Sequence, residues 1–467
     1  MTREWWLREE LLASRLAPGE ELPSAIRWIE IAEGMLPCGG RLLPGKVALD
    51  PAWIARLLRW RLAGLRPLVA TVAMEPGSGA ALDQAREAAL EIDVLAGGTL
   101  DAIRILPPSP FPIEVAADAA DATDATIAEA CALPPGMRRA GTPGDRAVAE
   151  RIRGGMLGLA VGDAIGAPVE NWPAEKIARI HGAFRDYVSG RGWGPGHPTR
   201  ETTFALLWFR EVADGRTVHL PADRDRIARA LADWVAARPR DFGHLTRAIL
   251  RAFRTQPPIP AARRAWEAAH RLPEFNSVLG RAAALGLALP YDFSLRAASV
   301  FAAAGMTQPA PVCLAASLLL AEGTAAAVRG EDPLEAARAA AYEPRTGAAL
   351  EEIASPESPE REWEPGGAEW NGHERGHPLK TLQAAFWASR CATRESKGFE
   401  EILLDLVHRG GDADTHGAAA GALLGAQLGP SAIPDRWLKR MRLLDLLEFA
   451  VRDRSAQSDS RKDDSRD

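Results

Sequence analysis

The sequence lacks the cysteine pattern of a zinc-binding or disulfide-linked protein. Its 467 residues include four cysteines, which are Cys38, Cys131, Cys313 and Cys391. They lie far apart and form no CxxC pair, which excludes the usual ligand spacing of a zinc finger and the density of a disulfide framework. We therefore expect four reduced thiols, as in a cytoplasmic protein.

An excess of positive charge and a long apolar run are also missing. Lys and Arg number 56 against 62 Asp and Glu, for a net charge of −6. This balance argues against a nucleic-acid partner or an anionic membrane surface. No uninterrupted apolar stretch reaches the roughly 20 residues that span a bilayer, and the start MTREWWLREELL lacks the order of a secretory signal. The sequence thus predicts no membrane partner.

Changes of composition divide the chain into four parts. Residues 1–115 combine the helical pattern WIARLLRWRLAGL with the β-like runs PLVATVAM, LDAIRIL and FPIEVAA, which predicts a small α/β module of unknown role. Residues 116–145 are rich in Ala, Asp, Thr, Pro and Gly and are predicted to be a linker, with one helix around 127–133. Residues 146–453 carry Ala/Leu-rich helical patterns and predict an all-α domain, so the fold class is mainly α. The charged residues 454–467 predict a disordered tail.

Two series of glycines recur at every fourth position. One comprises Gly154, Gly158, Gly162 and Gly166, and the other comprises Gly417, Gly421, Gly425 and Gly429. A glycine inside a helix costs about 1 kcal/mol relative to alanine, so eight of them require a structural reason. Glycine lets helix backbones approach closely, and we predict that the two helices pack tightly at the domain centre, against each other in the simplest arrangement.

Polar residues lie at the end of the first glycine helix and at the start of the second. The first ends in GDAIGAPVE, and the second begins with HRGGDADTHG, which contains Asp412, Asp414 and Thr415. Hard oxygen ligands of this kind suit Mg²⁺ or Mn²⁺. The alternative is ordinary helix capping by Asp or Thr, which the DxDT pattern alone would favour.

The surrounding motifs resemble the ADP-ribosylglycohydrolase family. GGMLGLAVGDAIGAPVE is similar to the family's first motif, and GGDADTHGAAAGALLGAQLGPSAIPDRW follows its GGDxDTxGAxxGAxxG…IPxxW pattern. GMTQPAPVCLAASLLLAEGTAAAVRG looks like the family's Thr-His-Pro helix with Gln308 in place of His. The Gly-Ala-Met-Arg stretch of the family is expected where this chain has GRAAALGLALP. The resemblance covers about residues 146–440 and leaves residues 1–145 outside.

The resemblance implies an all-α domain whose central cleft holds two Mg²⁺ or Mn²⁺ ions and removes ADP-ribose from modified acceptors. Carried over residue by residue, the resemblance implies that Asp412 or Glu170 is catalytic and that Glu170 lies beside the substrate ribose. It also implies substrate contacts from Gly410, Gly411 and, near adenine, His377. The implied metal ligands are Thr199, Glu201, Asp412, Asp414 and Thr415. A bland loop position for His377 and a surface position for Glu170 stay open as alternatives.

Arg200 stands where the family has the first Asp of its Thr-Asp-Asp-Thr motif. An arginine keeps its proton and offers no lone pair to a metal, but its fork matches a carboxylate. Three carboxylates (Glu201, Asp412 and Asp414) and one guanidinium leave two negative charges, so we expect one divalent ion rather than two, or none. The alternatives are a solvent-facing Arg200, Glu201 as a first-turn acid and Thr199 as a helix cap.

Two functions remain open from the sequence. The first is an ADP-ribosyl hydrolase with a reduced metal site, in which Asp412 or Glu170 assists the attacking water as general base. The second is a catalytically impaired relative that binds ADP-ribose or a nucleotide, or an interaction module that binds a protein through residues 1–115. Both the hydrolase and the binding protein are expected to act on a molecule that contains ADP-ribose.

Overall fold

The computed structural model describes residues 146–213, 221–236, 244–271, 273–354 and 376–442, three strands before them, and a few single residues. The chain divides into two compact units. Unit 1 comprises residues 1–135, 219–272 and 297–314, and unit 2 comprises residues 136–218, 273–296 and 315–467. The predicted linker, the predicted tail and the run FPIEVAA lie outside the described residues.

The described part of unit 1 holds a three-stranded sheet and helices. The strands β1 (Ile26–Glu33), β2 (Leu68–Met74) and β3 (Ala102–Leu106) lie in that order; β1 and β2 are antiparallel, and β2 and β3 are parallel. Strands β2 and β3 fall in the predicted runs PLVATVAM and LDAIRIL, whereas β1 was not predicted. The helices wholly within this unit are α8 (Pro221–Ala236), α9 (His244–Ala252) and α10 (Pro258–Ala268).

Unit 2 is built almost entirely from helices, which confirms the predicted all-α class for this part of the chain. Its described strands are the short pair β4 (Trp172–Pro173) and β5 (Gly410–Gly411). Two further helices, α12 (Phe293–Gly305) and α13 (Pro311–Arg329), have residues in both units. The helices of unit 2 itself are α5 (Arg146–Gly166), α6 (Ala174–His181), α7 (Arg200–Ala213), α11 (Leu279–Ala288), α14 (Pro333–Ala339), α15 (Pro344–Ala354), α16 (Pro378–Arg394), α17 (Phe399–His408), α18 (Ala413–Leu428) and α19 (Asp435–Arg440).

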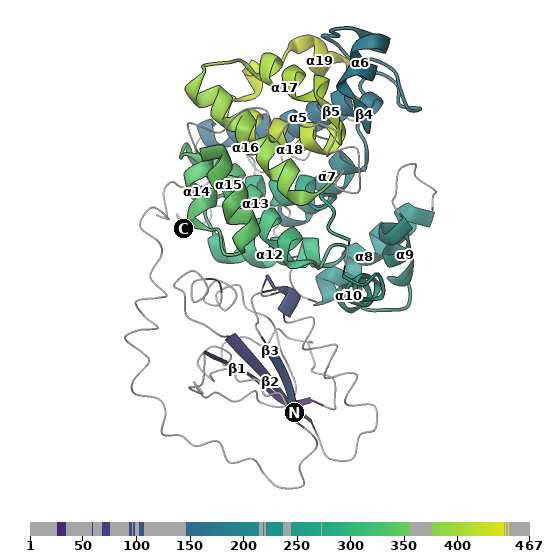
Figure 1. The fold of residues 1–467 in the computed structure, drawn as a ribbon, viewed down its shortest axis with the longest axis vertical. Coiled ribbons are helices and arrows are strands. Elements are labelled where there is room, and N and C mark those ends of the chain that lie inside the picture. The colour runs from purple at the N-terminus through teal and green to yellow at the C-terminus, as the bar shows by residue number, and fades with distance from the viewer. Residues whose placement is uncertain are drawn as a thin grey trace, which may run out of the picture. The chain divides into compact units, whose positions relative to one another are not determined.

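The two glycine series pack against each other along α5 and α18, which lie side by side (Figure 1). Gly154 faces Gly425, Gly158 faces Gly421 and Gly162 faces Gly417, so the helices run antiparallel. A Cβ atom added at any of these positions would lie closer to a backbone oxygen of the other helix than real side chains allow. The prediction of a tight helix pair is confirmed for these six glycines, because close backbone approach leaves no room for a side chain. Gly166 packs against the Ala413 carbonyl instead, whereas Gly429 lies just after the end of α18, has φ of 79° and would meet no atom within 4 Å.

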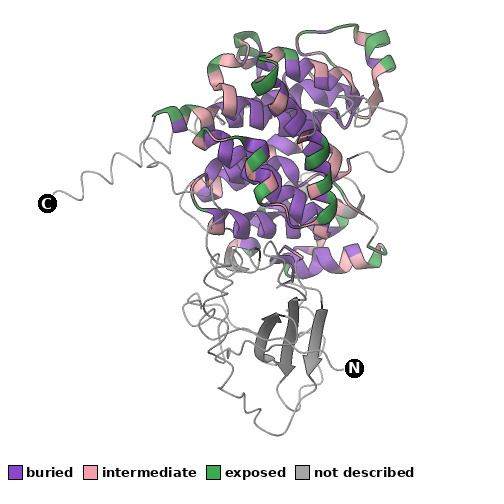
Figure 2. Ribbon diagram, turned by 60° about the vertical axis from the view of Figure 1, so that its left-hand side comes forward, coloured by how far each residue is buried: buried purple, intermediate pink, exposed green. Residues whose placement is uncertain are grey.

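The helix pair forms the interior of unit 2. Every residue of α18 from Ala413 to Ala426 is buried, as is every residue of α5 from Gly154 to Gly166, and the ribbon of Figure 2 shows this interior in purple. Among the described helices, α13 is the one long and apolar enough to cross a membrane, and 94% of its apolar window is buried within the protein. A buried core helix can match a membrane span in length and hydropathy, so α13 does not indicate a membrane span.

The antiparallel pairing also places two chain segments that are far apart in sequence. Helix α5 ends at Gly166 and continues through a turn of 3₁₀ helix, Ala167–Val169, to Glu170. Helix α18 begins immediately after Asp412 and carries Asp414 in its first turn. Because α5 ends beside the point where α18 begins, the pairing brings the acidic residues of both segments together.

Candidate functional site

Three buried carboxylates converge where α5 ends and α18 begins. Glu170, Asp412 and Asp414 each offer one oxygen atom, and these atoms all lie within 4.8 Å of one another. Their residues are 7%, 8% and 0% exposed. Oxygen ligands of an octahedral Mg²⁺ lie about 4.2 Å apart when opposite and about 3.0 Å apart when adjacent, so the three oxygens would move closer together around an ion.

The glycines before Asp412 are required by the backbone. Gly410 and Gly411 have φ of 81° and 73°, in the left-handed region that favours glycine. They form β5, which pairs with Trp172 and Pro173, and Asn171 donates its backbone N–H to the Gly411 carbonyl at 2.6 Å. This short pairing fixes the segment of Glu170 to the segment of Asp412. The substrate contacts predicted for both glycines stay predictions.

Asp414 and Thr415 each present a buried oxygen that has no hydrogen-bond partner in the described part of the chain. These atoms are Asp414 Oδ2 and Thr415 Oγ1. The other Asp414 oxygen accepts the backbone N–H of Thr415 at 2.9 Å. Burial raises the pKa of Asp414 well above its usual range, and the negative charges of Glu170 and Asp412 raise it further. A cation would satisfy both oxygens and relieve the repulsion.

Both oxygens of Glu170 have partners at the edge of this cluster. Asn171 donates its side-chain N–H to Glu170 Oε1 at 2.8 Å, and the Arg191 guanidinium lies 3.0 Å from Oε2. The Glu170 side chain is 9% exposed and that of Arg191 36%. Glu170 is thus a buried acid of the cluster, with Arg191 approaching it from the solvent side.

Asn276 holds Asp412 and was not predicted from the sequence. Its side-chain nitrogen donates to Asp412 Oδ2 at 2.5 Å and to Thr381 Oγ1 at 2.8 Å, and its backbone N–H donates to the Gly376 carbonyl at 2.7 Å. Asn276 lies three residues before α11 in the segment PEFNSVLG, where no periodicity or spacing singles it out. Only tertiary packing brings it to Asp412, 136 residues away along the chain.

Asp163 fixes the start of α7 and was also missed. Its Oδ2 accepts the backbone N–H groups of Thr199 and Thr202 at 2.8 and 3.0 Å, together with the Thr202 hydroxyl at 2.5 Å. Burial raises the pKa of Asp163 to about 6, although these hydrogen bonds oppose the rise. A charged residue within the otherwise apolar stretch GGMLGLAVGDAIG was the available signal. Thr199 Oγ1 accepts the Glu201 N–H at 3.1 Å, so Thr199 caps α7 as the alternative interpretation held.

Glu201 lies outside the three-acid cluster and contacts arginine. Arg200 Nε is 3.2 Å from Glu201 Oε1, and the Arg200 side chain is 15% exposed, which excludes a freely solvent-facing position. Burial raises the pKa of Glu201 to about 8, although the Arg200 charge opposes the rise. Arg281, in the stretch GRAAALGLALP, is buried beside them; burial lowers its pKa to about 10, and the charge of Glu201 counteracts this effect.

His377 caps α16 through one ring nitrogen and contacts an acid through the other. Its Nδ1 accepts the Leu379 N–H at 3.3 Å, and its Nε2 lies 3.1 Å from Glu274 Oε2. The contact with adenine that the resemblance implies stays a prediction. Both ring nitrogens of His377 already have partners within the protein. His416 is buried in α18, and burial lowers its pKa to about 4.

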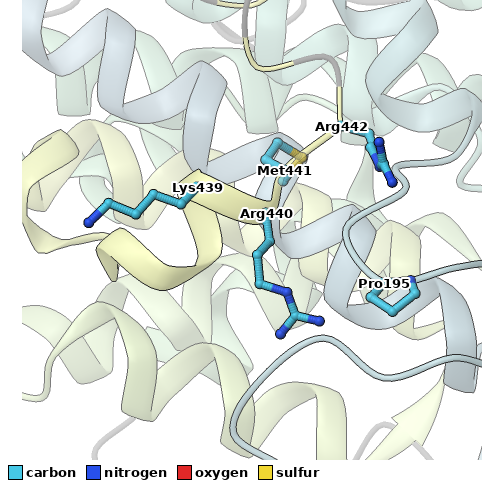
Figure 3. A pocket seen from close by; sticks show the side chains of 5 residues that line it. All are labelled: Pro195, Lys439, Arg440, Met441 and Arg442. Atoms are coloured by element: carbon cyan, nitrogen blue, oxygen red, sulfur yellow. The ribbon is translucent and has the colours of Figure 1, made fainter.

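A separate cavity of about 380 Å³ lies on the surface beside α19 (Figure 3). It is lined by Pro195, Lys439, Arg440, Met441 and Arg442. Arg440 also pairs with Asp186 at 2.7 Å, and the Lys439 side chain extends away from the other two basic residues. No carboxylate lines this cavity among the described residues, so it offers no metal ligands.

The site contains more carboxylates than guanidinium groups. Five buried carboxylates (Asp163, Glu170, Glu201, Asp412 and Asp414) accompany three guanidinium groups (Arg191, Arg200 and Arg281). Burial raises the pKa of Asp163, Glu201 and Asp414, and a nearby cation would favour their ionised forms. The three-acid cluster and the Thr415 hydroxyl supply the hard oxygen donors that Mg²⁺ and Mn²⁺ prefer.

Comparison with known proteins agrees with these features. The family model for ADP-ribosylglycohydrolase matches residues 144–463. The ADP-ribosyl-[dinitrogen reductase] glycohydrolase of Rhodospirillum rubrum is 31% identical over 304 residues, which cover 63% of this chain and 91% of that protein. ADP-ribosylarginine hydrolase Tri1 of Pseudomonas putida is 26% identical over 309 residues, which cover 62% of this chain and 74% of that protein.

A solved structure shows the same fold. It is described as an ADP-ribosylglycohydrolase-related protein complex, matches with a TM-score of 0.51 at 29% identity, and covers 67% of this chain and 100% of its own. The family model covers well over half of the chain and includes both glycine helices and all three clustered acids. From residue 144 onward, this chain belongs to the ADP-ribosylglycohydrolase family.

Proposed function

We propose that this protein hydrolyses the glycosidic bond between ADP-ribose and an acceptor, with one divalent ion held by Glu170, Asp412, Asp414 and Thr415. The observation that carries the proposal is the pair of buried oxygens, Asp414 Oδ2 and Thr415 Oγ1, which have no hydrogen-bond partner in the described chain and lie in a cluster of acids. Burying charge without compensation is costly, and a bound cation provides the compensation.

The second cation of the family's site is replaced by arginine in this proposal. Arg200 and Arg281 lie beside Glu201 in a buried setting, where they provide positive charge but no open coordination position. Asp163 fixes the start of α7 and thereby the position of Arg200 and Glu201. The site thus keeps the electrostatic balance of a second ion without its Lewis acidity.

The residues of the chain have distinct roles in the reaction. A bound Mg²⁺ or Mn²⁺ would supply Lewis acidity and lower the pKa of a coordinated water. Asn276 holds Asp412 in a single orientation, and Asn171 does the same for Glu170. Asp412 or Glu170 accepts a proton as the water oxygen bonds to the anomeric carbon of the ribose, while the bond from that carbon to the acceptor breaks. The same proton then passes from the carboxyl group to the leaving acceptor, so one water is consumed and the carboxylate is restored.

Release of ADP-ribose from an ADP-ribosylated protein in the presence of Mn²⁺ or Mg²⁺ tests the proposal. We expect release by the wild type and its loss in Asp414→Asn, which keeps the size of the side chain but removes its charge. Asp435→Asn, at an 84% exposed side chain on α19, is the matched control and should retain full activity. The proposal fails if the wild type releases nothing, or if Asp414→Asn is as active as the control.

A second candidate function is binding of ADP-ribose without turnover. The Arg200–Glu201 ion pair favours it, because arginine engages Glu201, which is not one of the three clustered acids. Calorimetry together with the release assay would distinguish the two functions. A non-catalytic protein would bind ADP-ribose in calorimetry and release none from modified substrates. A protein partner for residues 1–115 and a cytoplasmic location remain proposals from the sequence.

A further inference from the structure

Two residues with a left-handed backbone conformation hold the carboxylate of Glu170. Asn171 has φ of 60° and Arg191 has φ of 50°, in the left-handed region that side chains other than glycine rarely adopt. Asn171 donates to one Glu170 oxygen, and Arg191 pairs with the other. Strain of this kind persists only where the surrounding structure imposes it. Two of the five described non-glycine residues with positive φ thus hold one acid of the cluster, and the other three are His270, Arg271 and Ser396.

Arg191 reaches Glu170 from a short turn on the solvent side. It lies between Gly190 and Gly192, and the backbones of Gly190 and Trp193 pair across this turn at 2.7 and 3.2 Å. The Arg191 side chain is 36% exposed, against 9% for Glu170. Its guanidinium therefore lies at the rim of the acidic cluster, with one face on Glu170 and the other accessible to a ligand.

A divalent ion and the Arg191 guanidinium are competitors for the charge of Glu170. Glu170 belongs to the three acids that can surround an ion, and Arg191 neutralises the same carboxylate. Arginine keeps its charge and cannot join the coordination shell, so a cation close to Glu170 repels it. When the ion binds Glu170, the positive charge of the guanidinium at the rim is no longer compensated unless another anion binds there.

We propose that Arg191 exchanges partners, from Glu170 in the metal-free protein to the diphosphate of ADP-ribose in the metal-loaded one, and so couples the binding of the two ligands. A diphosphate offers the paired oxygens that match the guanidinium fork. The anion draws Arg191 from Glu170 and strengthens cation binding; by thermodynamic reciprocity, the cation strengthens anion binding by the same factor.

The inference rests on the proposed function for the divalent ion at Glu170 and for the identity of the anion, but not for hydrolysis. Competition between Arg191 and the cation follows from the Glu170 contacts alone. If the protein releases no ADP-ribose from substrates but shows the coupling, the hydrolase proposal fails and this inference stands. If it hydrolyses the bond without coupling, the reverse holds.

Calorimetric titration with Mn²⁺, in the absence and presence of ADP-ribose, tests the exchange in the full-length protein. The variant is Arg191→Gly, because glycine adopts the positive φ of this position without strain and removes the cation. The matched control is Arg185→Ala, which removes a loop arginine whose partner is Glu400 at 3.0 Å, outside the cluster. Complexes of Mn²⁺ with ADP-ribose in solution are the same for every protein, so the variants isolate the contribution of the site.

We expect ADP-ribose to tighten Mn²⁺ binding by the wild type and by Arg185→Ala on the order of tenfold, within the usual range of coupling between two sites. Arg191→Gly should bind Mn²⁺ alone about tenfold more tightly than the wild type and show no further gain with ADP-ribose. Equal Mn²⁺ affinities for the wild type and Arg191→Gly without ADP-ribose would overturn the inference. So would full coupling in Arg191→Gly.

Discussion

Replacing single glycines of the α5–α18 pair by alanine should separate the stability of the fold from the assembly of the acidic cluster. A Cβ atom at Gly162 would collide with the carbonyl of Gly417, and one at Gly154 with the carbonyl of Gly425. Both atoms belong to the backbone of α18 and cannot move without shifting the helix. Gly162 lies beside the start of α18 and the acids, whereas Gly154 lies about 12 Å further along α5.

The magnitude follows from two opposing contributions. Alanine gains about 1 kcal/mol over glycine in a helix, and overpacking costs about 3 kcal/mol where the neighbouring atom cannot yield. Each substitution should therefore lower the free energy of unfolding by about 2 kcal/mol. Gly347→Ala in α15 is the control, because its Cβ would meet no atom closer than 3.9 Å. It should raise stability by about 0.5–1 kcal/mol.

Urea unfolding measures stability, and calorimetric titration with Mn²⁺ measures the cluster. Gly162→Ala should weaken Mn²⁺ binding about tenfold or more, since a shift of α18 near Asp414 separates it from Glu170 and costs at least about 1.4 kcal/mol of binding free energy. Gly154→Ala should lose similar stability and keep its Mn²⁺ affinity within about twofold. Equal loss of Mn²⁺ affinity in both variants, or destabilisation by Gly347→Ala, would refute the reasoning.

Three further outcomes follow from individual contacts. Asn276→Ala should weaken Mn²⁺ binding about 10-fold to 100-fold in calorimetry, because Asp412 loses the group that orients it. Arg296→Met should cost about 3–5 kcal/mol in urea unfolding by leaving Glu322 buried without its bidentate partner at 2.6 Å, and adding Glu322→Leu should restore much of this. Burial alone would raise the pKa of Glu274, but hydrogen bonds from His377 and Arg345 lower it to about 2, so its stabilisation is complete above about pH 4.5 and lost as pH falls toward 2. The destabilisation by Glu274→Gln should therefore shrink between pH 6 and pH 3.5.

The glycine pair shows how far the sequence alone determines this fold. A four-residue spacing places all glycines of one series on one helix face, and their cost in a helix requires a tight packing partner. The pairing of α5 with α18 was therefore predictable, as was the position of Asp412, Asp414 and Thr415 at a helix start. Strand β1 was not predicted, although Pro23 and Ser24 precede IRWIEIAE and Gly34 follows it.

The tertiary structure alone decided how the polar residues are grouped. Glu170 joins Asp412 and Asp414 because antiparallel packing aligns the end of one helix with the start of the other, whereas Glu201 pairs with Arg200. Asn276 and Arg191 come to the cluster from loops, where no period relates a residue to its contacts. Local spacing in a sequence fixes which side chains share a helix face, but contacts between distant segments depend on how the helices pack, and that information is not local.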